Sequence, residues 1–319
     1  MKLRHLVWFI LYKVAVTHVA YAQFTYTING GSVTITGYTG TDSYVDIPST
    51  ISNYPVTSIG SSAFFGRSGI SGVSIPNGVV NIGDNAFSGS GLMDISIPGT
   101  TATIGNYAFA SVPLRSVSLG YGVSTIGTGA FRSCANLSRI SLPGSVTSLG
   151  AQAFHFSGLI SADLGNGVTM LGERLFDGCS ALTNVTMGNA VTNIGSLAFA
   201  FCPSLRNFTI PGQVRSIGEK AFISCSGLTN ALIGGKVTAI GSQAFASCTN
   251  LSTVYFQSNA PTPGVDVFSN CPNATVYYKP GAIGWPTVPN PWAGRPTALW
   301  ITPFLVTLDA QGGAVSPTA

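Results

Sequence analysis

The six cysteines are the residues of this 319-residue chain best suited to chemistry, because a thiol can act as a nucleophile, bind a metal ion or form a disulfide. Each cysteine lies three residues after a phenylalanine, as Cys225 follows Phe222. This constant offset indicates equivalent positions in a recurring motif. The six positions are Cys134, Cys179, Cys202, Cys225, Cys248 and Cys271.

Three interpretations of these cysteines are open. An even number in a secreted chain is typical of disulfides, and neighbouring repeats would bring the Cα atoms within disulfide range. Metal binding or catalysis is disfavoured, because no Cys-x-x-Cys pair occurs. Other copies of the motif carry Arg67, Ser90, Val112 or Ser157 at this position. Since these residues are not obligate pairs, we favour a ladder of free, buried thiols that pack as small hydrophobic side chains.

Histidine offers little further chemistry. His155 is the only histidine after residue 22, and it directly follows a motif phenylalanine. Other repeats carry Phe65, Arg132, Ile223 or Ala246 there, so we expect a variable residue on the outer turn. Gly-x-Ser-x-Gly, His-Glu-x-x-His, P-loop and dinucleotide-binding motifs are absent, and the acidic residues are scattered. The sequence predicts no catalytic residue, no cofactor site and no metal site, and therefore a protein that is not an enzyme.

The phenylalanines end a motif, Ile/Leu-Gly-x-x-Ala/Leu-Phe, that recurs every 22 or 23 residues. Because one repeat cannot bury its own apolar face, the copies must stack. We therefore predict a repeat solenoid of about ten repeats with the phenylalanines as an interior spine. The copies end at Phe64, Phe87, Phe109, Phe131, Phe154, Phe176, Phe199, Phe222, Phe245 and, in a decayed form, Phe268.

Each repeat contains two short β-type runs. Leu137, Ile140 and Leu142 have the spacing of a strand with one inward face, and Pro143 ends it. A second run, such as residues 191–195, leads to the next phenylalanine and ends in a glycine that allows the chain to turn. The segment between phenylalanine and cysteine is predicted to be a single helical or 3-10 turn.

The pattern V-T-x-I-G-x-x-A-F-x-x-C-x-x-L-x-x-V-x-I-P, over residues 45–271, resembles the BspA-type leucine-rich repeat of bacterial surface proteins. The resemblance implies a right-handed leucine-rich-repeat superhelix with a parallel β-sheet on its concave face. Short β or 3-10 turns would form the convex side. It also implies secretion or surface display, and binding of a protein or of extracellular matrix rather than catalysis.

The ends of the chain differ from the repeats. Residues 1–22 have the basic start, apolar stretch and Ala-x-Ala site of a signal peptide. Residues 23–44 alternate around an Asn-Gly-Gly turn and predict a β-hairpin cap. Residues 272–303 are rich in proline and aromatic residues, so Trp285, Trp292 and Trp300 are interpreted first as cap packing and second as a binding patch. Residues 304–319 resemble the start of an internalin-type B repeat, either truncated or a simple tail.

Charge and hydropathy exclude two classes of partner. Only 8% of the residues are charged, and the chain after residue 22 contains eleven basic and ten acidic residues. Nucleic acid binding requires a concentrated positive surface, so no nucleic acid partner is expected. No later run approaches the roughly 18 apolar residues of a membrane span. We therefore expect a secreted or cell-surface monomer with no membrane insertion after signal cleavage.

Binding residues are expected on the outer face of the first strand of each repeat, where residues flanking the central apolar position point outward. One interpretation is that this surface binds a partner, with the aromatic side chains at its C-terminal end making the main contacts. The other is that these are ordinary strand residues without a binding role, and that the C-terminal cap covers Tyr255. The chain is accordingly an adhesion module or a structural stalk, the latter a fragment of a larger surface protein without its own ligand. The candidate ligand-binding residues are Arg139, Asp163, Asn184, Asn207, Asn230, Leu232 and Tyr255.

Overall fold

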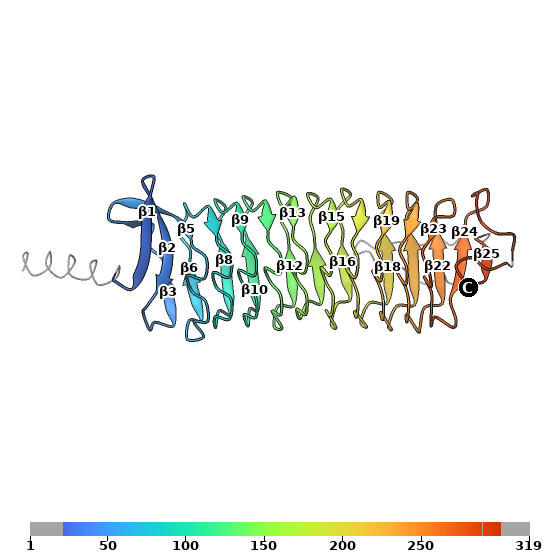
Figure 1. Cartoon of the computed structure of the whole chain (residues 1–319), viewed down its shortest axis with the longest axis horizontal. Coiled ribbons are helices and arrows are strands. Elements are labelled where there is room, and N and C mark those ends of the chain that lie inside the picture. Colours follow the sequence, from blue (N-terminus) through green and yellow to red (C-terminus); the bar gives the residue numbers. More distant parts are fainter. Residues whose placement is uncertain (1–21, 289, 301–319) are drawn as a thin grey trace, which may run out of the picture.

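The computed structural model describes residues 22–288 and 290–300, and it is an elongated stack of coils built from strands and turns (Figure 1). No helix occurs in these residues, so none is long and apolar enough to span a membrane. The predicted signal peptide lies outside the described residues except for Ala22, and the B-repeat-like tail lies outside them entirely. The predicted solenoid of parallel strands is confirmed.

One column of parallel strands, the long strands, comes from the L-x-x-V-x-I part of each repeat. They divide into three sheets: β3-β6-β8-β10, β12-β14-β16 and β18-β20-β22-β24-β25. Their bounds are β3 Tyr44–Asp46, β6 Gly72–Ser74, β8 Asp94–Ile97, β10 Ser116–Leu119, β12 Arg139–Ser141, β14 Ser161–Asp163, β16 Asn184–Thr186, β18 Asn207–Ile210, β20 Asn230–Ile233, β22 Thr253–Phe256, β24 Thr275–Tyr278 and β25 Thr297–Leu299.

A second column, the short strands, comes from the V-T-x-I-G part of each repeat and divides into two sheets, between β13 and β15. Their bounds are β5 Tyr54–Ile59, β7 Asn81–Ile82, β9 Thr103–Ile104, β11 Thr125–Ile126, β13 Ser148–Leu149, β15 Met170–Leu171, β17 Asn193–Ile194, β19 Ser216–Ile217, β21 Ala239–Ile240 and β23 Thr262–Pro263.

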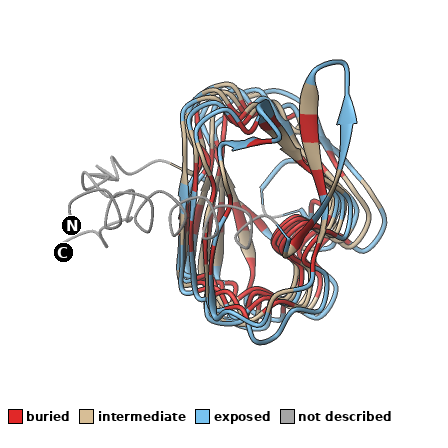
Figure 2. Ribbon diagram, turned by 90° about the vertical axis from the view of Figure 1, so that its left-hand side faces the viewer, coloured by how far each residue is buried: buried red, intermediate tan, exposed pale blue. Residues whose placement is uncertain are grey.

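The N-terminal coil is a hairpin. Strands β1 (Phe24–Asn29) and β2 (Ser32–Tyr38) pair antiparallel around the Asn-Gly-Gly turn that the sequence indicated. Strand β2 then pairs parallel with β5, and β4 (Thr50–Ile51) pairs antiparallel with β5. The hairpin therefore covers the first edge of the short-strand column, and it projects at one corner of the stack when viewed end-on (Figure 2).

The segment around each phenylalanine is a series of tight turns, so the prediction of a helical or 3-10 turn was wrong there. Around Phe64, alternate N–H groups close turns within the repeat at 3.1–3.3 Å, and the others donate to the next repeat at 2.7–2.9 Å. The residues two before and two after each phenylalanine have positive φ, as at Gln152 (60°) and Phe156 (55°). A helix would keep all its N–H groups inside the segment, whereas these turns share them with the neighbouring coil.

The glycine that ends each short strand is required by its neighbour in the stack. A Cβ added at Gly218 would lie 2.5 Å from the backbone nitrogen of Ser196, and one at Gly241 would lie 2.4 Å from that of Glu219. Neither glycine has a positive φ. Close backbone approach between stacked corners, rather than conformational freedom at the turn, therefore selects glycine.

The core is a column of phenylalanine rings. The ten motif phenylalanines are at most 1% exposed, and neighbouring rings stack with centroids 4.9–5.8 Å apart and planes inclined by 2–18°. This confirms the predicted spine. Tyr38 continues the column at the N-terminal end, with its ring centroid 5.7 Å from that of Phe64.

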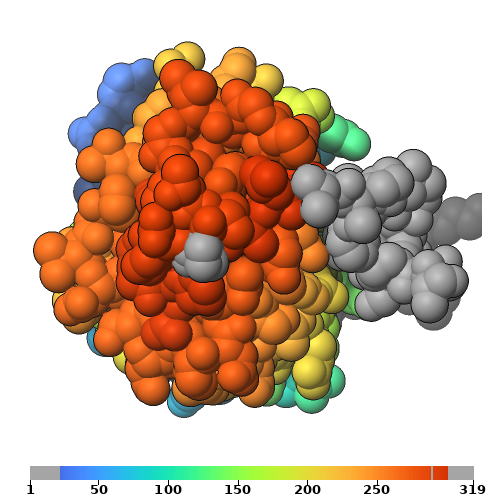
Figure 3. Space-filling view, turned by 90° about the vertical axis from the view of Figure 1, so that its right-hand side faces the viewer, coloured from blue at the N-terminus to red at the C-terminus, as the bar shows by residue number. Residues whose placement is uncertain are grey.

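The C-terminal end is closed by residues of the predicted cap, whose surface covers the end of the stack (Figure 3). Trp285 stacks on Tyr278 with ring centroids 4.9 Å apart, and Trp292 lies across the end of the spine, 6.3 Å from Phe268. Arg295 donates a guanidinium hydrogen bond to the carbonyl oxygen of Phe268 at 3.0 Å. The cap therefore satisfies a backbone acceptor that the last repeat would otherwise leave open.

Candidate functional site: the long-strand face

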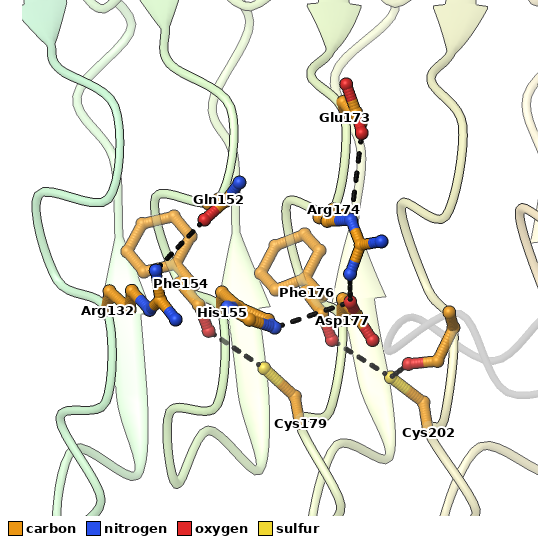
Figure 4. Close-up of polar contacts among 11 residues, drawn as sticks. Arg132, Gln152, Phe154, His155, Glu173, Arg174, Phe176, Asp177, Cys179 and Cys202 are labelled. Carbon is orange, nitrogen blue, oxygen red and sulfur yellow. Dashed lines mark hydrogen bonds and ion pairs between the residues drawn. The ribbon is translucent and has the colours of Figure 1, made fainter.

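The thiols form a ladder along the spine. Each Sγ donates to the carbonyl oxygen of the phenylalanine in the preceding repeat at 3.0–3.2 Å, as Cys179 does to Phe154 (Figure 4). All six cysteines are free and 0% exposed, which confirms the predicted ladder of buried thiols. Burial raises the pKa of Cys134 to about 12 and that of Cys179 to about 11. The thiols of Cys134 and Cys179 are therefore protonated packing groups rather than nucleophiles.

His155 is a buried side chain, so its predicted place on the variable outer turn was wrong. It is 6% exposed, and its Nε2 lies 3.3 Å from Oδ2 of Asp177, which is 3% exposed (Figure 4). Arg174 donates from Nη1 to the same Oδ2 at 3.0 Å. The ring of Phe156 stacks on the imidazole with ring centroids 4.0 Å apart.

The His155 cluster is a structural link between two coils. Burial lowers the pKa of His155 and raises that of Asp177. Nδ1 of His155 is buried and has no hydrogen-bond partner, as suits a neutral imidazole that donates from Nε2 and carries no proton on Nδ1. His155 and Asp177 occupy the same position in adjacent repeats, directly after the phenylalanine. Their 22-residue spacing therefore indicates in the sequence that the two side chains lie next to each other in the stack. Within residues 22–288 and 290–300, no group of His, Cys, Asp and Glu side chains could hold a metal ion.

The long-strand face is the surface formed by the outward side chains of the long strands. Burial alternates along these strands, as in β18, where Phe208 is buried and Asn207 is exposed. A groove of about 580 Å³ crosses the face over β10, β12, β14 and β16. Three of the predicted ligand-binding residues line it together: Arg139, Asp163 and Asn184.

The groove lies where the long-strand column is interrupted. Strands β12, β14 and β16 pair with one another, but no ladder in the described chain joins β10 to β12 or β16 to β18. Small hydroxyl side chains, including Ser116, Ser138 and Ser161, belong to the lining of the groove. Arg115 lines it from the β10 side, directly before that strand. The repeat pattern does not point to Arg115, because this residue precedes β10 and occupies neither of the two outward positions inside the strand.

Two other predicted residues are engaged with each other. Asn230 donates from Nδ2 to Oδ1 of Asn207 at 2.8 Å, and the hydroxyl of Thr253 donates to Oδ1 of Asn230. This ladder of side chains links β18, β20 and β22. Asn207 and Asn230 therefore stabilise the sheet, and part of their hydrogen-bonding capacity is already used.

The aromatic end of the face packs against the cap. Tyr255 stacks on Tyr277 with ring centroids 5.1 Å apart, and its ring lies 5.1 Å from that of Trp300. Burial raises the pKa of Tyr255, which is half-buried. Leu232, also half-buried, lies beside Tyr255 in the β20–β22 register. The face thus contains a polar groove in the middle and an aromatic cluster at the C-terminal end, on different strands.

The repeat matches a known family model. The model for the BspA type leucine rich repeat region matches residues 43–161 and 147–275. The chain belongs to the BspA-type leucine-rich repeat family. A search among curated proteins found no match.

Solved structures of leucine-rich repeat proteins resemble this BspA-type chain at low identity. A leucine-rich repeat protein from Bacteroides ovatus is 21% identical over 87% of this chain and 98% of its own, with a TM-score of 0.49. One from Eubacterium ventriosum is 22% identical over 80% and 76%, with a TM-score of 0.47. A leucine rich cell surface protein from Faecalibacterium prausnitzii is 21% identical over 80% and 93%, with a TM-score of 0.42.

Proposed function

We propose that this BspA-type protein is a secreted or cell-surface monomer that binds a protein partner through the long-strand face and catalyses no reaction. The observation that carries the proposal is the groove, in which Arg139, Asp163 and Asn184 converge from three neighbouring strands. A rigid sheet displays these side chains at fixed spacing, which suits recognition better than a mobile loop would. The family and the predicted signal peptide support surface display.

The opposite surface is less suited to binding. The turns around the phenylalanines expose a mixture of residues, and their backbone groups are used between coils. His155 and Asp177, which belong to these turns, are buried and offer little polar surface to a ligand. Stacked repeats commonly bind partners over an extended surface of one face, and the long-strand face contains a groove.

A bulky substitution on each face tests the proposal. Ser141 is exposed in the groove on β12, and Glu219 is exposed on the turn side. With purified extracellular-matrix proteins immobilised on a biosensor, Ser141→Tyr should weaken binding of the best partner at least about tenfold, because the added ring obstructs the groove. Glu219→Tyr should leave binding unchanged. Equal binding by both variants would contradict the proposal, and binding to none of these proteins would favour the structural stalk.

A further inference from the structure

The groove contains two arginines that the protein itself does not use. Arg115 and Arg139 line it from adjacent strands, and both side chains are exposed. Neither guanidinium makes a hydrogen bond or an ion pair with another described residue, whereas the guanidinium of Arg174 binds Asp177 and that of Arg295 binds a backbone carbonyl. The planar guanidinium group binds carboxylates through paired hydrogen bonds. This corner of the groove is therefore suited to a ligand that carries carboxylates.

The backbone of the groove offers a second kind of contact. Val117, Ile140 and Ala162 belong to its lining, although the side chains of Ile140 and Ala162 point into the core and are at most 4% exposed. These residues present mainly backbone to the groove. Because no ladder joins β10 to β12, N–H and C=O groups at this edge have no partner strand. An extended peptide satisfies such groups through its own main chain.

The acidic side chains in and beside the groove, and the lack of aromatic residues in its lining, favour a peptide over an anionic polymer or a sugar. Asp163 lies on β14, beyond β12 from the two arginines' side of the groove, and Asp94 is engaged by the hydroxyl of Ser116 at 2.5 Å. A uniformly anionic polymer would meet the Asp163 carboxylate, whereas a peptide can place carboxylates on the arginines and a donor beside Asp163. No aromatic ring lines the groove, so a sugar ring would find no apolar platform there.

We infer that the groove binds an extended acidic peptide segment of the partner protein, with carboxylates on Arg115 and Arg139. This inference rests on the proposed function and specifies the chemistry of its partner. The peptide passes over β10, β12 and β14, its main chain meets the backbone groups left unpaired between β10 and β12, and a hydroxyl or amide donor faces Asp163. The groove volume of about 580 Å³ lies within the range typical of small-ligand sites.

The test measures binding of a fluorescein-labelled octapeptide of Glu, Ser and Gly to the whole protein by fluorescence anisotropy. Arg115→Ala/Arg139→Ala should raise the Kd about tenfold or more, because each guanidinium loses charge-assisted hydrogen bonds. Asp163→Asn should lower the Kd about two- to threefold by removing a like charge. Binding by the wild type should weaken as salt increases, since exposed charges are screened.

The matched control is Arg206→Ala. Arg206 is exposed and directly precedes β18, as Arg115 precedes β10, but it lies outside the groove. Its substitution should leave the Kd unchanged. A peptide with Lys in place of Glu should bind at least about tenfold more weakly than the acidic peptide. Circular dichroism and melting temperature verify that each variant is folded, as expected for substitutions of exposed side chains.

Failure of the inference is distinct from failure of the proposed function. Absence of peptide binding at millimolar concentration, or an unchanged Kd for Arg115→Ala/Arg139→Ala, overturns the inference. Binding of an oligogalacturonate through the two arginines, without binding of the acidic peptide, also overturns it in favour of a sugar acid. A matrix partner that is lost from Ser141→Tyr but retained by the double arginine variant leaves the proposed function intact. Full binding by Ser141→Tyr contradicts the proposed function itself.

Discussion

At the scale of single residues, the cysteines show why a residue can be repeated without being reactive. The turn around each phenylalanine leaves its carbonyl oxygen facing the next coil, and the next thiol reaches it at 3.0–3.2 Å. A cysteine is small enough for the core and can still donate a hydrogen bond. Ser90 occupies the same position in an early repeat, but its buried Oγ has no partner. The ladder therefore depends on the longer reach of sulfur.

This comparison predicts that two substitutions change the free energy of unfolding in opposite directions. Cys225→Ser should lower the free energy of unfolding by about 1–3 kcal/mol, because the shorter hydroxyl is left buried and unpaired. Ser90→Cys should raise it by about 1 kcal/mol, because the thiol can reach the preceding phenylalanine carbonyl. Denaturant unfolding under reducing conditions measures both, and thiol titration of the unfolded chain should find six thiols in the wild type. Destabilisation by Ser90→Cys would show that the hydrogen bond does not matter there.

His155 predicts a pH dependence of stability. The unfolded chain protonates this residue near pH 6.5, whereas burial lowers its pKa in the folded protein. Between these two values the unfolded state binds more protons, so stability should decrease as the pH falls below about 6.5. The raised pKa of Asp177 has the opposite effect wherever that buried carboxyl is protonated in the folded protein but ionised in the unfolded chain.

The measurement is the melting temperature between pH 7.5 and 5.5. The wild type should lose stability over this interval, and His155→Gln should show a smaller slope, since its amide can still donate to Asp177 but does not titrate. Glu219→Gln, an exposed substitution on the turn side, should retain the slope of the wild type. A wild-type melting temperature that rises toward pH 5.5 would contradict the neutral buried imidazole.

At the scale of elements, the turn segment explains how a coil of 22 or 23 residues satisfies its backbone. Half of the N–H groups around the phenylalanine close turns, and half pair with the next coil. Left-handed residues on both sides of the phenylalanine set this alternation, and they include bulky residues such as Phe156 and Phe201. Such conformations cost energy in isolation, so the stacked neighbours must stabilise them.

The phenylalanine column supplies much of that stabilisation. Phe199→Ala should lower the free energy of unfolding by about 3–5 kcal/mol, because it opens a cavity between two stacked rings. The matched control is Phe201→Ala, two residues away, where the side chain is 53% exposed and the expected change is within about 0.5 kcal/mol. Chemical denaturation monitored by circular dichroism compares the two. Equal losses from both substitutions would mean that burial in the column is not the source of stability.

At the scale of the whole molecule, the interruptions of the ladders are staggered. The long-strand column is interrupted between β10 and β12 and between β16 and β18, whereas the short-strand column is interrupted between β13 and β15. Each junction between coils thus keeps at least one strand ladder in addition to the turn ladder. The link between His155 and Asp177 joins the two coils where the short strands are interrupted. The core consequently remains continuous from Phe24 to the terminal tryptophans.

The repeat period, the interior phenylalanines, the outward positions of the long strands and the buried cysteines were determined by the sequence alone. Each follows from the types and spacing of residues within one repeat, and stacking multiplies a local rule. The tertiary structure decided what depends on neighbouring coils: the turns in place of a helix, the burial of His155, and the pairing of Asn207 with Asn230. It also decided where the ladders are interrupted, and therefore which arginines meet in a groove. These features arise between residues about 22 positions apart, because a side chain in a solenoid is surrounded mainly by the coils before and after its own.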